Sequence, residues 1–480
     1  MKIMNEIIKS KHLALIFLLL TTLLPSNIIN AEVKKYSIDE AIQTALENNR
    51  EVKIAFMDIK KADAAVDEAY GYAYPRIDLS GQFYHFIQKV KMPFPDFQTL
   101  LGNAVYGILF DEKVLPYDPS KFKPVNYVLQ EFSLANNYEA KAQITQVLFS
   151  SAVFTGIGTS KIYSQLVREQ LKSIVSKVVV NVRTAFYGVT LTKEMVSILE
   201  KTIANMEEHF RNVKALYDQG IVSEFDLLQI EVLLENTRPQ LTQMQNNLKA
   251  ATDGLKVLMG INPNEEIDVD GKLEYNEEAL SATDDLIQKS YKMNYDLNTL
   301  QFKKIVDEAI VDVQRADYYP SLAAFANYSL SGSSDNFKFQ NYSSAIVGLN
   351  LSINVFSGFQ TNKKVEQAKI GVMQTEEQIK QFKDYLALQI RTQVNEIESI
   401  KKQIAAQNHN IRLAQKAYDL SLVRFKEGTG TELEVKDSEI QLYSAKTNYL
   451  KSVYDYTIAK IKLDNLLGDL DEKWIKLIEK

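Results

Sequence analysis

The chain of 480 residues carries a formal net charge of −6 and contains no cysteine. The missing cysteines exclude disulfides, thiolate chemistry and a lipid anchor on an N-terminal cysteine. The acidic balance argues against nucleic acid as a partner, because phosphate binding needs a basic face. Glycine and proline are sparse, and five of the ten prolines fall between Pro93 and Pro124. The rest of the chain is therefore free to form long helices.

The first 31 residues have the pattern of a Sec-type signal peptide. Lys2, Lys9 and Lys11 form a basic start, an apolar run too short for a comfortable bilayer crossing follows, and the small residue Ala31 ends the segment. We therefore expect residues 1–31 to be removed on export. No other apolar run approaches the length of a membrane-spanning helix, so none is expected in the remainder.

The remaining chain is predicted to divide into two structural repeats, 32–265 and 266–480. The segment LYDQGIVSEFD (216–226) aligns with RFKEGTGTELE (424–434), and the same offset places Gly260 on Gly468. Upstream, AYPRIDLSG (73–81) aligns with YYPSLAAFA (318–326) at a larger offset, because the first repeat carries a longer insertion.

Each repeat is predicted to contain a helix, a strand hairpin and a long helical hairpin. The first repeat has a helix near 37–72, strands near 75–87 and 138–149 around a loop insertion at 88–137, a helix at 154–219, a hairpin tip near 220 and a helix at 223–259. The second repeat has a helix near 284–317, strands near 320–330 and 344–356, a helix at 359–427, a tip near 428 and a helix at 431–467.

Apolar residues recur every seven positions along four of these helices. The four series run from Val182 to Tyr217, from Leu227 to Leu255, from Ile390 to Phe425 and from Val435 to Leu463. One such series would fit an ordinary bundle core, but four in register favour coiled-coil packing. Each longest helix would extend about 100 Å, which suits an object that crosses an aqueous gap. Pro239 is expected to kink or end its helix.

The strand segments alternate apolar and polar residues. In 344–358, Val347, Leu349 and Leu351 alternate with Gly348 and Asn350. Alternation over about ten residues is typical of a transmembrane β-strand, although a soluble two-faced sheet shares it. Four strands cannot close a barrel, and lipid does not tolerate an open edge. We therefore expect copies of the chain to share one barrel, and this argument permits two, three or more copies.

The insertion at 88–137 is predicted to be a long loop outside the barrel, because its prolines argue against a helix or a central strand. Its aromatic residues would either fold over the barrel mouth or pack the loop against itself, and the second is favoured. These residues are Phe94, Phe97, Phe110 and Phe122.

The hairpin tips are marked by glycine. Gly220, Gly428 and Gly430 are assigned to turns, because glycine adopts the backbone angles at which one helix stops and the next begins. Thr431 fits a helix N-cap, and Glu434 would complete a capping box with it. Asp437 lies one turn further along the same face as Glu434.

The duplicated order of helix, strand hairpin and helical hairpin behind a signal peptide resembles the TolC family of outer-membrane efflux proteins. The segments that carry the resemblance are AYPRIDLSG, YYPSLAAF, NVFSGFQTNKKVEQAK and EGTGTELEVKDSEIQLYSAKTNYL. The resemblance implies a mainly α fold with a β-barrel part, in which a homotrimer forms a twelve-stranded barrel in the outer membrane and an α-helical tunnel through the periplasm. It further implies a passive exit duct of a tripartite efflux or type I secretion system. The partners would be outer-membrane lipid, a periplasmic adaptor (membrane fusion) protein and an inner-membrane transporter.

The resemblance also assigns a periplasmic entrance constriction to Glu434 and Asp437, and to Asp226 at the matching position of the first tip. Members of the family carry a basic residue after the Gly-Thr pair, which helps to latch the closed state. Gly430 stands there in this chain, so that Lys436 or Arg424 would have to serve instead. Three copies would gather six carboxylates around one axis, which predicts a constriction that prefers cations.

No catalytic, metal-binding or cofactor-binding constellation is predicted. The four histidines are scattered without partners at metal-ligand spacing, and His209 and His409 are expected to be exposed or half-buried on helices. The alternative function is a periplasmic adaptor or structural coiled-coil protein, for which one helical hairpin within β-rich domains would be expected.

Overall fold

The computed structural model describes residues 33–469 and 472–478, which fall into two compact units. The helical unit comprises the described residues up to Ile54, Lys172–Asn294 and those from Tyr385 onward. The strand unit comprises Ala55–Leu171 and Tyr295–Asp384. The expected signal peptide lies outside the described residues.

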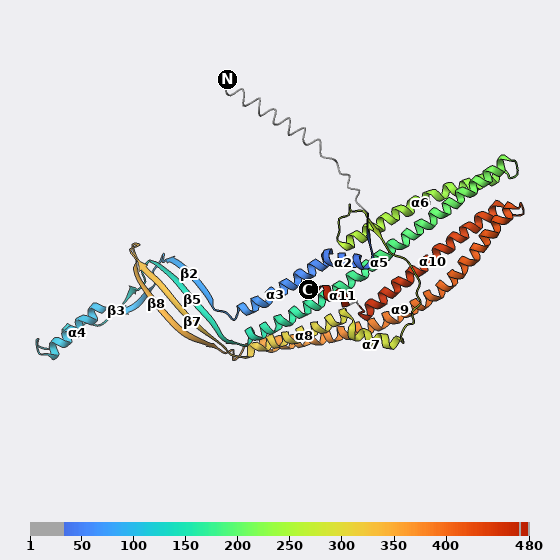
Figure 1. The fold of residues 1–480 in the computed structure, drawn as a ribbon. Coiled ribbons are helices and arrows are strands. Elements are labelled where there is room, and N and C mark those ends of the chain that lie inside the picture. The colour runs from blue at the N-terminus through green and yellow to red at the C-terminus, as the bar shows by residue number, and fades with distance from the viewer. Residues whose placement is uncertain (1–32, 470–471, 479–480) are drawn as a thin grey trace, which may run out of the picture. The chain divides into compact units, whose positions relative to one another are not determined.

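The strand unit is built on a four-stranded antiparallel sheet with the order β2-β5-β7-β8 (Figure 1). Each strand lies at a segment predicted as a strand, although the last one begins earlier and ends earlier than expected. The strands are β2 (Arg76–His85), β5 (Asn136–Ser150), β7 (Ser321–Ser334) and β8 (Gln340–Ser352).

The sheet has one mainly apolar and one mainly polar face. Its register places Ile77, Ile144, Ala326 and Val347 in one row across all four strands. Paired residues project to the same face, and neighbours along a strand project to opposite faces. Val347 remains 84% exposed, so the described part of the chain does not cover this apolar face.

Residues 86–135, which we call the arm, connect β2 to β5. The expectation of a loop without a helix is wrong, because α4 (Phe97–Asp111) is a helix of 15 residues. The prolines lie at its flanks, so they do not interrupt it: Pro95 precedes the helix and Pro116 follows it. Asp96 caps the helix by accepting a hydrogen bond from the backbone of Gln98.

The rest of the arm is a short hairpin that packs on itself. β3 (Lys91–Pro95) pairs antiparallel with β4 (Tyr127–Glu131), and η1 (Pro119–Lys121) lies between α4 and β4. The rings of Phe94 and Phe132 are in contact, as are those of Phe110 and Phe122. The expectation that the loop packs against itself is thereby confirmed for these rings.

Long helices form most of the helical unit, and α3, α5 and α9 contribute residues to both units. A parallel pair of short strands and a small C-terminal helix, none of them predicted, also belong to the helical unit. The helices that contribute to it are α2 (Ile38–Asn48), α3 (Arg50–Gly71), α5 (Ser151–Asp218), α6 (Glu224–Met259), α7 (Thr283–Met293), α9 (Gln360–Lys426), α10 (Glu432–Leu467) and α11 (Glu472–Ile478), and its strands are β1 (Lys34–Tyr36) and β6 (Ile267–Val269). The strand unit further contains α8 (Tyr295–Arg315) and η2 (Ala316–Tyr318).

Members of the four seven-residue series form much of the core of the helical unit, although Tyr217 near the end of α5 is exposed. Val182, Ile390, Val435 and Leu463 are all at most 1% exposed, which is the burial that coiled-coil core positions require. One window of α5 is apolar enough to cross a membrane by length and composition, contrary to expectation, but 44% of it is buried inside the protein. α6 continues through Pro239 and therefore does not end there.

Two junctions of the helical unit have the same construction. The C-cap Gly260 of α6 lies against the backbone of Asn48 at the α2–α3 break, and the C-cap Gly468 of α10 lies against that of Met293 at the α7–α8 break. Asn49 donates a side-chain hydrogen bond to Leu258 O at 2.8 Å. Asn294 donates in the same way to Leu466 O at 3.1 Å. An asparagine side chain thus connects each helix break to the C-terminal end of α6 or α10.

Candidate entrance site at the hairpin tips

The three tip glycines serve two different purposes. Gly220 and Gly428 follow α5 and α9 with φ of +73° and +68°, a left-handed conformation that glycine adopts without strain. Gly430 does not have a positive φ. A Cβ there would approach Arg424 Cβ and Glu434 Oε2 to 3.0 Å, so a larger residue would require these neighbours to shift.

Asp226 belongs to the start of α6. Its carboxylate accepts hydrogen bonds from Ser223 Oγ at 2.6 Å and from Ser223 N at 3.1 Å, while Asp226 N donates to Ser223 Oγ at 3.2 Å. This reciprocal capping box satisfies backbone donors that a helix start leaves unpaired. The side chain is half-buried.

Glu434 is held differently at the start of α10. Thr431 caps the helix and accepts from Glu434 N at 3.3 Å, but the Glu434 carboxylate pairs with Arg424 at 3.2 Å, so the expected capping box is wrong. Arg424 also donates to Thr429 O at 3.1 Å. Of the two candidates to replace the missing basic residue, Arg424 is thus the one that contacts Glu434. Asp437 lies exposed one turn further on.

A buried ionisable cluster lies close behind the second tip. His209 Nε2 is 2.6 Å from Glu432 Oε2, and the residues are 7% and 1% exposed. The expectation that His209 is exposed or half-buried is therefore wrong, because Glu432 of α10 and Phe425 of α9 pack against it. His409 is exposed as expected. Glu439 follows one heptad after Glu432 and is 4% exposed. One carboxylate oxygen of each glutamate has no hydrogen-bond partner among the described residues.

Burial governs the chemistry of this cluster. It raises the pKa of Glu439 to about 7; the nearby His209 opposes this shift and the Glu432 carboxylate adds to it. Burial likewise raises the pKa of Tyr418, with Glu439 contributing. A cavity of about 250 Å³ between α5, α9 and α10 adjoins the cluster, lined by Lys201, Tyr418, Glu439, Tyr443 and Lys446 among others.

The cluster could have been found from the heptads. Glu432 and Glu439 each precede a residue of the apolar series, Val435 and Leu442, by three positions, which is the other core position of a heptad. Polar residues there are rare, because a buried charge is costly. Among the described residues, no group of three or more His, Cys, Asp and Glu side chains could hold a metal ion.

Comparisons with known proteins agree with this architecture. The model of the outer membrane efflux protein family matches residues 131–261 and 286–469. The outer membrane protein TolC of Salmonella enteritidis is 22% identical over 352 residues, covering 71% of this chain and 70% of that protein. The alkaline protease secretion protein AprF of Pseudomonas aeruginosa is 23% identical over 347 residues, covering 72% of each.

A solved structure shows the same fold over nearly the whole chain. The crystal structure of CusC superposes with a TM-score of 0.67 at 17% identity, covering 90% of this chain and 92% of that one. CusC is a protein of Escherichia coli named for a cation efflux system. The resemblance to TolC-like channels deduced from the repeats is thereby confirmed. The chain belongs to the outer membrane efflux protein family and is an exit duct of the outer membrane with a periplasmic extension.

Proposed function

We propose that three copies of this chain share one twelve-stranded barrel, which opens into a helical tunnel through the periplasm. The observation that carries this proposal is the four-stranded sheet with an uncovered apolar face. In the described chain, β2 and β8 each pair with one neighbouring strand only. Unpaired strand edges are not tolerated in lipid, so β8 of one copy joins β2 of the next.

The direction of the strands is compatible with this joint. Successive strands in the order β2-β5-β7-β8 are antiparallel, so β8 runs opposite to β2. Every seam between copies is therefore antiparallel as well. Two copies would give eight strands, whose interior side chains fill. Three copies give twelve, which leaves a passage.

The tips are the proposed periplasmic entrance, with Glu434, Asp437 and Asp226 around it. Asp437 and Glu434 are both exposed, and three copies would crowd these carboxylates, which attracts cations. Arg424 restrains Glu434 within its own chain, while Asp226 also caps α6. A periplasmic adaptor protein and an inner-membrane transporter would supply cargo and energy, as in a tripartite efflux or type I secretion system. We also propose that residues 32–265 and 266–480 are two structural repeats, since the two junctions are built alike.

Two adjacent residues of β8 test the barrel. Leu349 belongs to the apolar face and Asn350 to the opposite one. Leu349→Arg should reduce the amount of assembled protein in the outer membrane, because an arginine facing lipid costs about 2–4 kcal/mol near the midplane. Asn350→Arg should still assemble into heat-sensitive trimers on gels and change only the conductance in planar bilayers. Equal tolerance of both substitutions, with a monomeric mass for the detergent-free protein, would favour the periplasmic adaptor instead.

A further inference from the structure

The arm carries a helix whose outer side is left uncovered. α4 has no charged residue from Phe97 to Phe110, and none of its residues is buried. A helix that is apolar on most of its sides is normally covered by protein or lipid. The inner and outer sides of α4 differ in what covers them.

The arm itself covers the inner side. Asn103 Nδ2 donates to Lys123 O at 2.7 Å, and Lys123 N donates to Asn103 Oδ1 at 2.9 Å. One turn and two turns further along the same side, the rings of Tyr106 and Phe110 stack, and Phe110 contacts Phe122. The segment that returns from α4 to β4 is thus the partner of this side.

The opposite side carries four large apolar residues that we call the outer stripe. Phe97, Leu101, Val105 and Ile108 follow one another at spacings of four, four and three, which aligns them along one side of the helix. They are 59%, 54%, 46% and 62% exposed. This is the spacing at which one helix packs against another.

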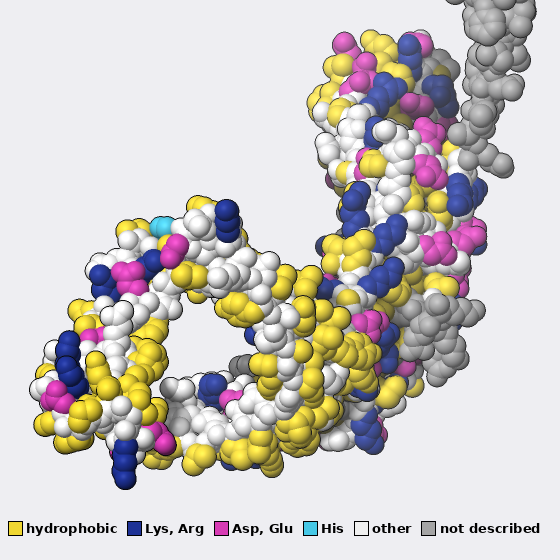
Figure 2. All heavy atoms as spheres, turned by 90° about the vertical axis from the view of Figure 1, so that its left-hand side faces the viewer, with side chains coloured by type: hydrophobic (Ala, Val, Ile, Leu, Met, Phe, Trp, Pro, Cys, Tyr) yellow, Lys and Arg dark blue, Asp and Glu magenta, His cyan; other side chains and the backbone are white. Residues whose placement is uncertain are grey.

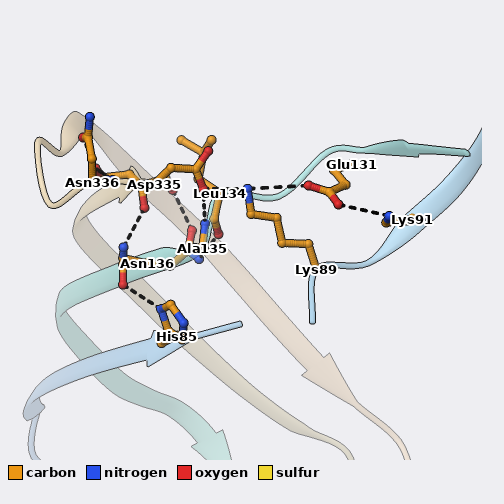
Figure 3. Close-up of polar contacts among 12 residues, drawn as sticks. His85, Lys89, Lys91, Glu131, Leu134, Ala135, Asn136, Asp335 and Asn336 are labelled. Atoms are coloured by element: carbon orange, nitrogen blue, oxygen red, sulfur yellow. Dashed lines mark hydrogen bonds and ion pairs between the residues drawn. The ribbon is translucent and has the colours of Figure 1, made fainter. Parts of the chain in front are cut away.

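One ion pair and one hydrogen bond tie the base of the arm to the turn between β7 and β8 (Figure 3). Lys89 lies 2.7 Å from Asp335, in the turn between β7 and β8, and 3.6 Å from Glu131. Asp335 also accepts from Ala135 N at 2.8 Å. Because both ends of the arm are tied to the sheet, the arm is a braced extension of β2 and β5.

We propose that the outer stripe packs against the outer stripes of neighbouring copies of this chain, so that α4 helices form a cap over the barrel mouth. The inference rests on the proposed homotrimer. The arm rises from β2, the edge at which the β8 strand of a neighbour would join, so the arm stands beside the seam.

Figure 2 is seen from the α4 side and shows a hollow bordered by the arm and the sheet. The stripe is uncharged, so an identical stripe would cover it without leaving a polar group unpaired. Lipid would do the same, so the position of the arm beside the seam is what favours another copy.

The cysteine-free chain allows a direct test. Val105→Cys in the full-length protein, oxidised in native outer membranes, should give covalent dimers on non-reducing gels. Tyr127→Cys is the matched control, because this residue of the same arm is 72% exposed but lies on β4. It should stay monomeric on those gels. A maleimide dye added to denatured protein that has not been oxidised should label both variants, which shows that both thiols are present and reduced.

The outcomes separate the two proposals. Native mass spectrometry first shows whether wild-type and both variants are trimers, and a monomeric wild-type would overturn the barrel proposal itself. Trimers in which Val105→Cys forms no dimer would overturn the cap alone. A fluorophore attached to the thiol of the Val105→Cys variant would then report what covers the stripe. Quenching by doxyl lipids would identify lipid as the cover, and quenching by aqueous iodide would show an uncovered arm.

Discussion

At the scale of single residues, Glu439 is a carboxyl group that the fold keeps out of water. It is a residue of α10 and lies near His209 of α5 and Glu432 of α10. Replacing one charged partner in such a setting leaves the other uncompensated, which costs more than the pair contributes. The packing of the two helical hairpins therefore depends on the protonation state of these few side chains.

This coupling predicts a pH dependence with a defined sign. The folded-state pKa of Glu439 is about 7, above its ordinary value of 4.5, so its contribution to stability is complete below pH 4.5 and is lost as pH rises through 7. Hydrogen exchange of residues 432–446, corrected for intrinsic rates, should show local stability falling from pH 5 to 8 by up to about 3 kcal/mol. Glu439→Gln should flatten this slope, whereas Glu434→Gln, at an exposed carboxylate, should leave it. An unchanged slope in Glu439→Gln would assign the effect elsewhere.

Neutralising the proposed constriction should change ion selectivity. The variant Glu434→Gln with Asp437→Asn removes two carboxylates per copy, so the reversal potential in a salt gradient should shift toward that of a non-selective pore. The control removes two exposed acids of the strand unit, Asp312→Asn with Glu377→Gln, and should shift it less. Equal shifts from both variants would show that net charge, and not the tips, sets selectivity.

At the scale of elements, α6 and α10 each end at a glycine that lies against the break between two other helices. Gly260 and Gly468 have φ of +69° and +71°, and an added Cβ would meet backbone atoms of the break. The sequence alignment paired these glycines, and helix–glycine patterns are local enough to be predicted. It did not reveal the contact with Asn49 and Asn294, because that depends on segments about two hundred residues away.

Gly468→Ala should therefore destabilise the helical unit. Left-handed backbone costs alanine about 1–2 kcal/mol, and the contact with Met293 adds to this cost. The control is Gly254→Ala within α6, where a Cβ meets nothing within 4 Å and where alanine should stabilise the helix by about 0.5–1 kcal/mol. Thermal unfolding followed by circular dichroism distinguishes the two. A lower thermal unfolding midpoint in Gly254→Ala than in Gly468→Ala would refute the proposed role of the C-cap glycine Gly468.

At the scale of the whole molecule, periodicity carried most of what could be predicted. Seven-residue series and two-residue alternation each report which side of an element is buried, so the helical hairpins and strands follow from them. The arm could not be predicted in this way. Prolines lie on both sides of α4, and they suggested a segment without a helix. The heptad positions of Glu432 and Glu439 could have indicated their burial. The pairing of His209 with Glu432 could not be predicted, because it joins two hairpins whose packing no local pattern specifies.

Only one of the two strand hairpins carries an arm, and only one of the two tips carries the Arg424–Glu434 pair. A ring of three copies would alternate two kinds of hairpin in an approximately sixfold wall, yet the arms and the tip ion pairs would recur only three times. Neighbouring hairpins around the ring are thus chemically unequal. An adaptor that grips one kind could therefore shift alternate members of the wall while the others stay in place.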